Sequence, residues 1–230
     1  MSHPSRLGTF SNTPQVTESF LNNTPCFLEE PDWLEAVAAC KAESDRFSDR
    51  SPLAVDMVVL IIGLPGAVKR VGDVICSDSP TTNSIASVRR EVRDLRKGIR
   101  LWRNRFDTEL LLNLPSAPVS ASEKYKRLDA LANALMFEII LARLIGSVIP
   151  SDRFVMEDEI QEHGAYIARI EEECMKQDYR TAFYMSQKGM IAVSLMESSP
   201  LWRLPVQRQE DLIEAWKFRQ WCDSVPRRSP

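Results

Sequence analysis

The sequence has few cysteines, and none lies close to another. Its five cysteines are each at least 14 residues from the next along the 230-residue chain. This spacing excludes a CxxC zinc knuckle, and the odd number excludes a framework in which every cysteine is paired. Residues 1–16 also lack the apolar core of a signal peptide. We therefore expect free thiols and a chain that stays inside the cell.

Glycine is scarce too, with eight residues, and the Asn-Gly and Asp-Gly pairs that mark tight hairpins are absent. Fourteen prolines are present, yet residues 81–114, 119–149 and 151–199 contain none. These intervals are long enough for helices and carry helical periodicity. We predict an all-α fold, a single helical domain of about seven or eight helices over residues 25–223. Residues 1–24 and 224–230 are expected to be disordered tails.

The chain lacks a long uninterrupted apolar run and a strong net charge. Its longest apolar run, residues 57–68, is broken by Gly63, Pro65 and Gly66, whereas a membrane-spanning helix needs about 20 residues. The 29 basic and 32 acidic side chains leave a net charge of −3, so the surface as a whole does not attract nucleic acid or anionic lipid. We expect no membrane segment and no direct binding of nucleic acid.

A strongly basic segment, residues 88–106, is nevertheless present, with the pattern of a two-faced helix. Apolar residues recur at alternating steps of four and three, namely Val88, Val92, Leu95, Ile99, Trp102 and Phe106. The intervening basic residues are Arg89, Arg90, Arg93, Arg96, Lys97, Arg100 and Arg103. We predict that Trp102 points into the core and that the basic face points outward. The candidate partner-binding residues are Arg89, Arg93, Arg96, Lys97 and Arg100.

A second helix, after Pro150, offers the opposite charge. Its apolar seam is Met156, Ile160, His163, Ile167, Ile170 and Cys174. Residues 157–173 contain seven acids and one basic residue, Arg169. We expect the basic and acidic helices to pack as neighbours, and a protein partner or phosphate remains an alternative source of negative charge. Exposed ion pairs between them would add about 0.2–1 kcal/mol each.

His163 is the only histidine outside the predicted N-terminal tail, and Glu159 lies one helical turn before it. Its place on an apolar seam favours a hydrogen-bonded core histidine. Zinc needs at least three protein ligands, and no G-x-S-x-G nucleophile motif is present. We expect no catalytic site, metal or cofactor. The alternative is a helical enzyme or small-molecule binder with a site near Glu159 and His163, lined by Met and Trp residues.

The acidic run at residues 158–162 resembles the metal-binding helix of all-helical terpene-forming enzymes, but the second metal-binding helix of such enzymes has no counterpart here. Magnesium is usually held by one or two carboxylates together with substrate phosphates. The acidic run is therefore interpreted as a solvated helix face.

Four features occur in order along residues 26–222. They are an apolar helix ending in Leu64-Pro65-Gly66, the segment Leu95 to Trp102, the pair Leu201-Trp202, and a closing segment from Trp216 to Trp221-Cys222. This order resembles the C-terminal regulatory region of fungal zinc-cluster transcription factors, which is found also in proteins of fungal biosynthetic gene clusters. The six-cysteine zinc cluster of that family is absent.

The resemblance implies an all-helical regulatory or protein-interaction module without zinc-directed DNA binding. It also implies a nuclear location, with the cytoplasm as the alternative, and action through a protein partner. A small-molecule effector and the regulation of a biosynthetic gene cluster are further expectations from the same resemblance. The identity of the partner and the oligomeric state stay open.

Overall fold

The computed structural model describes residues 13–42, 47–48, 50–112 and 120–177, together with 188–189, 192–193, 197–200 and 202–203. Within these ranges all regular elements are helices. The α-helices are α1 (Thr13–Asn22), α2 (Pro31–Ala38), α3 (Pro52–Ile62), α4 (Leu64–Ile75), α5 (Thr82–Phe106), α6 (Ala121–Val148) and α7 (Arg153–Gln177). The predicted all-α fold is confirmed for the described residues.

Three helices, α3, α5 and α6, begin at a hydroxyl side chain. Ser51, Thr81 and Ser120 each accept a hydrogen bond from the backbone N–H three residues later, which satisfies a donor that the first helical turn leaves unpaired. Pro31 and Pro52 occupy the first position of α2 and α3, where proline's missing N–H costs nothing. These local signals fix where the helices start.

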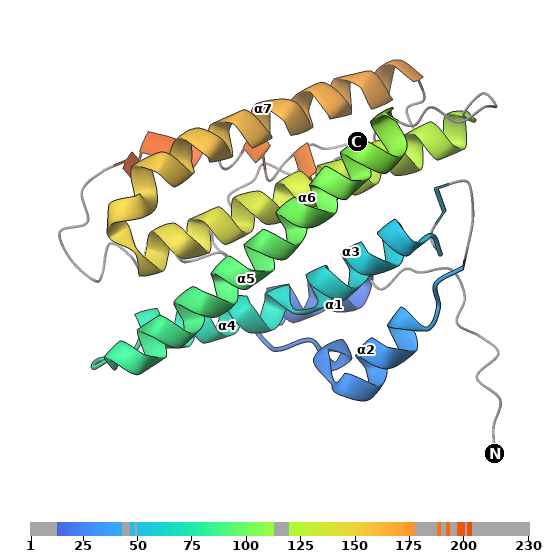
Figure 1. Ribbon diagram of the computed structural model, residues 1–230. Helices are drawn as coiled ribbons and strands as arrows, with labels where there is room; N and C mark the ends of the chain where they lie inside the picture. Colours follow the sequence, from blue (N-terminus) through green and yellow to red (C-terminus); the bar gives the residue numbers. More distant parts are fainter. Residues whose placement is uncertain are drawn as a thin grey trace.

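Helix α6 lies at the centre of the arrangement. Figure 1 shows α5 and α7 running along α6, with α3 and α4 on the other side of α5. The predicted apolar seams of α5 and α7 are buried here, and the side chain of Trp102 is 2% exposed. Because both seams face the central helix, the basic and acidic faces lie beside each other at the surface.

Two stretches, Pro52–Ile75 and Ala121–Val148, are long and apolar enough to cross a membrane by length and composition alone. The first consists of α3 and α4, which Gly63 separates. In the second, 83% of the most apolar window is buried inside the protein. Burial among neighbouring helices accounts for this apolar character.

The N-terminal boundary of the domain corrects a prediction. Residues 1–24 were expected to be a disordered tail, but α1 covers 13–22 and buries Val16 to 3% exposure. Val16 packs in a second apolar cluster with residues from α2 and α3, including Val37 and Val55. Tertiary contacts stabilise this short helix, which its polar sequence does not predict. Residues 204–230, including the predicted closing helix and C-terminal tail, lie outside the described residues.

The C-terminal end of α5 is followed by a change of helix type. Helix α5 ends at Phe106, the last residue of the predicted apolar pattern, and a π-helical segment, Asp107–Leu112, follows. The change of helix type brings Leu110 onto the core and lets its carbonyl accept a hydrogen bond of 3.0 Å from Arg127.

Candidate functional site

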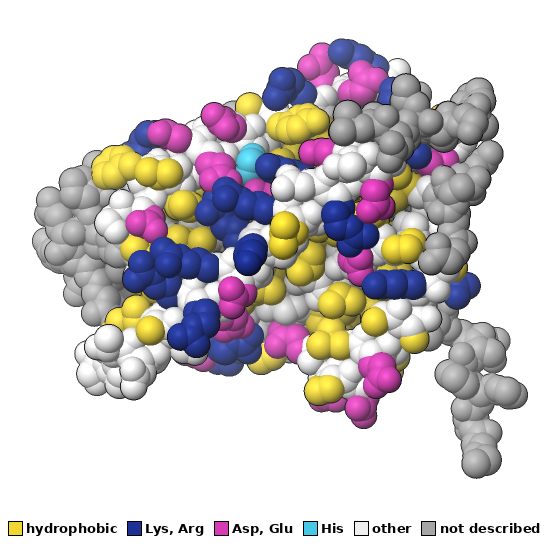
Figure 2. Space-filling view, viewed as in Figure 1, with side chains coloured by type: hydrophobic (Ala, Val, Ile, Leu, Met, Phe, Trp, Pro, Cys, Tyr) yellow, Lys and Arg dark blue, Asp and Glu magenta, His cyan; other side chains and the backbone are white. Residues whose placement is uncertain are grey.

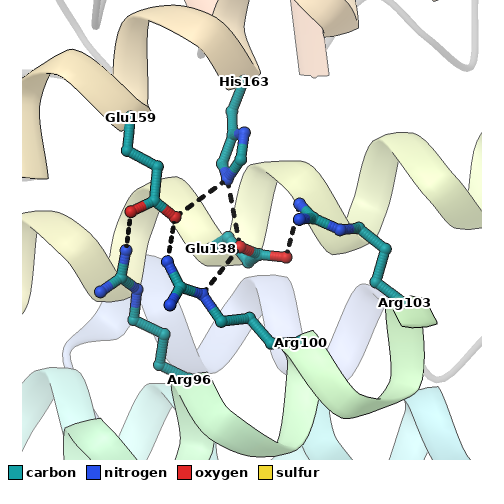
Figure 3. A network of polar contacts seen from close by, with 6 residues as sticks. All are labelled: Arg96, Arg100, Arg103, Glu138, Glu159 and His163. Atoms are coloured by element: carbon teal, nitrogen blue, oxygen red, sulfur yellow. Dashed lines mark hydrogen bonds and ion pairs between the residues drawn. The ribbon is translucent and has the colours of Figure 1, made fainter.

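A cluster of charged side chains joins α5, α6 and α7 (Figure 3). We call it the polar network. Its members are Arg96, Arg100 and Arg103 from α5, Glu138 from α6, and Glu159 and His163 from α7. It contains the residues of the alternative candidate site, Glu159 and His163, and two of the predicted partner-binding arginines.

Glu159 is held from both sides. Arg96 Nη2 donates to its Oε2 over 2.5 Å, Arg100 Nη2 donates to its Oε1, and His163 Nε2 lies 3.3 Å from Oε1. Burial favours a raised pKa for this carboxyl, but the hydrogen bonds from His163 and Arg100 and the charge of Arg96 prevail and hold the pKa of Glu159 far below its usual range. Glu159 is therefore ionised, and its oxygens are already hydrogen-bonded.

Glu138 is completely buried, with 0% of its side chain exposed. Arg103 Nη1 lies 2.8 Å from its Oε1, and Arg100 Nε lies 3.5 Å from its Oε2. The Arg103 contact is an ion pair that lacks hydrogen-bond alignment. A buried carboxylate needs such partners, because an unpaired charge in the core is costly. Sequence reasoning missed Glu138, although a single acid inside the most apolar part of α6 was a usable signal.

His163 donates to or accepts from Glu138, with its Nε2 3.1 Å from Glu138 Oε2. Burial favours a lower pKa for the imidazole, yet the hydrogen bonds to Glu138 and Glu159 outweigh it and raise the pKa of His163 above its usual value. The prediction of a hydrogen-bonded core histidine is confirmed.

The same three residues, Glu138, Glu159 and His163, offer ligand atoms within 4.8 Å of one another. The carboxylate oxygens also face Arg96, Arg100 and Arg103, so a metal ion would meet three positive guanidinium groups. The arrangement is better explained as a network that ties three helices together than as a cation site.

The structure divides the predicted partner-binding residues into two groups. Arg96 and Arg100 bind Glu159, and the side chain of Arg96 is only 8% exposed. The prediction that Arg96 points outward is therefore wrong. Its position borders the apolar stripe of α5, from where a long guanidinium side chain reaches α7. Arg89 and Lys97 are exposed and form no ion pair with a described residue.

The expected pairing of the basic and acidic helices is confirmed in part. Glu159 binds α5, but other acids of α7 pair elsewhere: Glu157 with Arg143, Asp158 with Arg203, and Glu173 with Lys124. Arg93 of α5 lies 3.5 Å from Asp152, which precedes α7. The basic side of α5 thus keeps more charge than its neighbours neutralise.

Beside the polar network lies a groove of about 310 Å³. Its lining residues are Arg93, Arg96, Lys97, Arg100, Leu101 and Asn104 of α5, Ile145 of α6, Asp152, and Met156 of α7. Figure 2 shows Lys and Arg side chains gathered over α5 next to the histidine. The groove therefore combines cationic walls with apolar side chains from three helices.

A second buried charge pair lies in the C-terminal part of α6, and the sequence analysis did not predict it. Arg143 Nη2 donates to Glu157 Oε1 over 3.0 Å, and burial lowers the pKa of Arg143 to about 9 although Glu157 opposes the shift. The guanidinium groups of Arg143 and Arg153 stack on Trp202, at 4.2 and 4.7 Å from its ring centre. This cluster fastens the segment at 202 to α6 and α7.

In the alternative interpretation Met and Trp residues line a ligand site, but no described tryptophan lines the groove. Trp33 is exposed on α2, whereas Trp102 and Phe137 are buried in the core. Met185, Met190 and Trp216 lie outside the described residues.

Comparisons with known proteins leave function to the geometry of the chain itself. No family model, no curated protein and no solved structure matches this sequence.

Proposed function

We propose that this chain is a regulatory protein-interaction module that binds an acidic segment of a protein partner and has no catalytic activity of its own. The binding surface is the outer basic face of α5, formed by Arg89, Arg90, Arg93 and Lys97. The observation that carries the proposal is that these four side chains are exposed and that none of them binds an acid of α7, whereas Arg96 and Arg100 of the same helix both bind Glu159.

The outer basic face is suited to an acidic partner because its charge is not cancelled locally. Arg89, Arg90 and Lys97 form no ion pair with a described residue, and Arg93 has only Asp152 at 3.5 Å. Clustered exposed charges of one sign steer association with a partner of the other sign and make its rate depend on salt.

A protein partner suits this face better than nucleic acid does. Single strands are usually bound by exposed rings placed among basic groups, but the aromatic residues of α5, Trp102 and Phe106, are buried. The net charge of −3 also gives the whole chain no general attraction to phosphate backbones.

The geometry gives little support to the alternative of a catalytic site near Glu159 and His163. A general base needs a free oxygen or nitrogen within reach of a substrate proton. Both oxygens of Glu159 are engaged by arginines, and His163 Nε2 is shared between Glu138 and Glu159.

The resemblance to the regulatory region of fungal zinc-cluster transcription factors supplies the rest of the proposal. It favours a nuclear location and a role in controlling a biosynthetic gene cluster through other regulators. Fluorescent tagging of the chain in a fungal cell tests the location, and exclusion from the nucleus would contradict that part.

Binding is tested with a labelled 20-residue peptide of glutamate and leucine, followed by fluorescence anisotropy with the purified chain. We expect saturable binding that weakens with salt and falls at least tenfold in the double variant R89E/R90E. The control K69E/K176E makes the same change in net charge on α4 and α7 and should bind as wild type does. Equal losses in both variants, or no binding at all, would overturn the proposal.

A further inference from the structure

We infer that the groove between α5 and α7 is a binding site for a small amphipathic anion, a carboxylate or phosphate group carried on a short apolar chain. The site shares Arg93 and Lys97 with the outer basic face, but it is formed by the groove as a whole and does not depend on the proposed partner. It adds an effector site to the molecule.

The charges that line the groove indicate that its ligand is an anion. Four cationic side chains, Arg93, Arg96, Lys97 and Arg100, share the groove with one acid, Asp152. Glu159 takes one hydrogen bond from each of Arg96 and Arg100, which leaves Lys97 and most of the Arg93 guanidinium uncommitted. An excess of positive charge in a concave site concentrates anions.

Arg96 places a largely buried positive charge beside the groove. Its side chain is 8% exposed, it binds Glu159 through Nη2, and its Nε has no hydrogen-bond partner among the described residues. Buried donors in proteins are normally satisfied, and an unsatisfied one costs free energy. Arg127 Nε, outside the groove, is in the same condition, so Arg96 contributes its positive charge to the groove rather than a free donor.

The apolar part of the ligand follows from the other lining residues. Ile145 of α6 is buried, Met156 of α7 is partly buried, and Leu101 of α5 is 54% exposed. Ile145 and Met156 already pack in the core, so Leu101 is the side chain that an alkyl chain would cover and a bare inorganic anion would leave exposed. Methionine adapts readily to ligands of different shape.

The size of the groove sets the class of ligand. At about 310 Å³ it lies at the lower end of the range of roughly 300–1,000 Å³ for small-molecule sites. This favours a ligand of small size over a folded segment of a partner.

The test is calorimetric titration of the full chain with four probes, each below its critical micelle concentration: octanoate, octyl phosphate, octanol and inorganic phosphate. We expect one saturable site for at least one of the two charged alkyl probes, and at least tenfold weaker binding of octanol and inorganic phosphate. Whether octanoate or octyl phosphate binds more tightly identifies the preferred head group. Absence of saturable binding of both, or equally tight binding of octanol, would overturn the assignment.

Three variants locate the site. R93Q/K97Q should weaken binding at least fivefold, while R89Q/R90Q, with the same change in charge on the same helix, should stay within twofold of wild type. Met156→Ser should weaken the alkyl probes without changing inorganic phosphate. Equal losses in the two double variants would show nonspecific attraction and reject the groove. Because the acidic peptide is tested with R89E/R90E, failure of one proposal does not imply failure of the other.

Discussion

The indole nitrogen of Trp102 donates a hydrogen bond of 2.6 Å to the carbonyl oxygen of Leu53, in the first turn of α3. The ring also stacks on Phe106, with ring centres 5.0 Å apart. A buried tryptophan needs a partner for its N–H, and here that partner belongs to a different helix. This contact joins the basic helix to the N-terminal half of the fold.

Replacing Trp102 by phenylalanine should lower the free energy of unfolding by about 1–3 kcal/mol, because it removes the hydrogen bond and part of the buried ring. Urea denaturation followed by circular dichroism measures the change. Trp33→Phe is the control, since Trp33 is 43% exposed, and it should change the free energy of unfolding by less than about 0.5 kcal/mol. Similar effects of the two substitutions would contradict the packing described for Trp102.

Gly66→Ala should also destabilise the protein. The backbone N–H of Gly66, in the first turn of α4, donates to Glu29 Oε1 over 3.0 Å, and a Cβ at position 66 would overlap the Glu29 carboxylate. We expect a loss of about 1–3 kcal/mol from the broken hydrogen bond and the displaced charge.

Gly63→Ala provides the matched control for this substitution. A Cβ at position 63 would make an ordinary contact of 3.5 Å with Leu95, and the backbone there has a φ of −76°. The effect should lie between zero and about 1 kcal/mol of stabilisation. If Gly66→Ala were as well tolerated as Gly63→Ala in denaturation experiments, the Glu29 contact would not hold the start of α4.

The stability of the protein should depend on pH through His163. Because the pKa of His163 is raised in the folded state, its stabilising effect is fully present below the unfolded pKa of about 6.5 and is lost as pH rises through the folded pKa. Each unit of difference between the two pKa values corresponds to about 1.4 kcal/mol.

This effect is measured by urea unfolding of wild type and H163Q at several pH values from 6 to 9. The difference in the free energy of unfolding between the two proteins should shrink as pH rises. Glu159 does not contribute to this pH dependence, because its lowered pKa keeps it ionised over this whole range. A constant difference would mean that the imidazole does not change protonation on unfolding.

Arg96 and Glu159 should be energetically coupled. A double-mutant cycle with R96Q and E159Q should give a coupling free energy of about 1–3 kcal/mol, because the guanidinium is largely removed from water and the bond is charge-assisted. The exposed pair Lys176–Glu172 on α7 is the control and should show no measurable coupling. Equal coupling in the two cycles would show that burial adds nothing to the first pair.

The positions of several helices could be predicted from the sequence because their signals are local. The four-and-three spacing of apolar residues placed α5 and its buried Trp102, and the structure adds Thr81 as the cap at its start. Spacing alone also placed His163 on the buried face of α7. The short helix α1 was not predicted, since its stability comes from Val16 packing on residues far along the chain.

The candidate site shows where local reasoning ends. Periodicity assigned Arg96 to a polar face, but it does not say how far a guanidinium reaches or what lies next to it. Glu138 is 42 residues further along the chain and Glu159 is 63, so their meeting with α5 depends on how three helices pack around α6.

The residue pattern by itself thus determined that the chain is helical, which side of each long helix is apolar, and that α5 is basic. Tertiary structure alone decided which of those basic groups are neutralised inside the protein and which remain for a ligand or partner. The reason is physical: hydrogen bonds within a helix and burial of one stripe depend on neighbours three or four residues away, whereas pairing of buried charges depends on distances between helices.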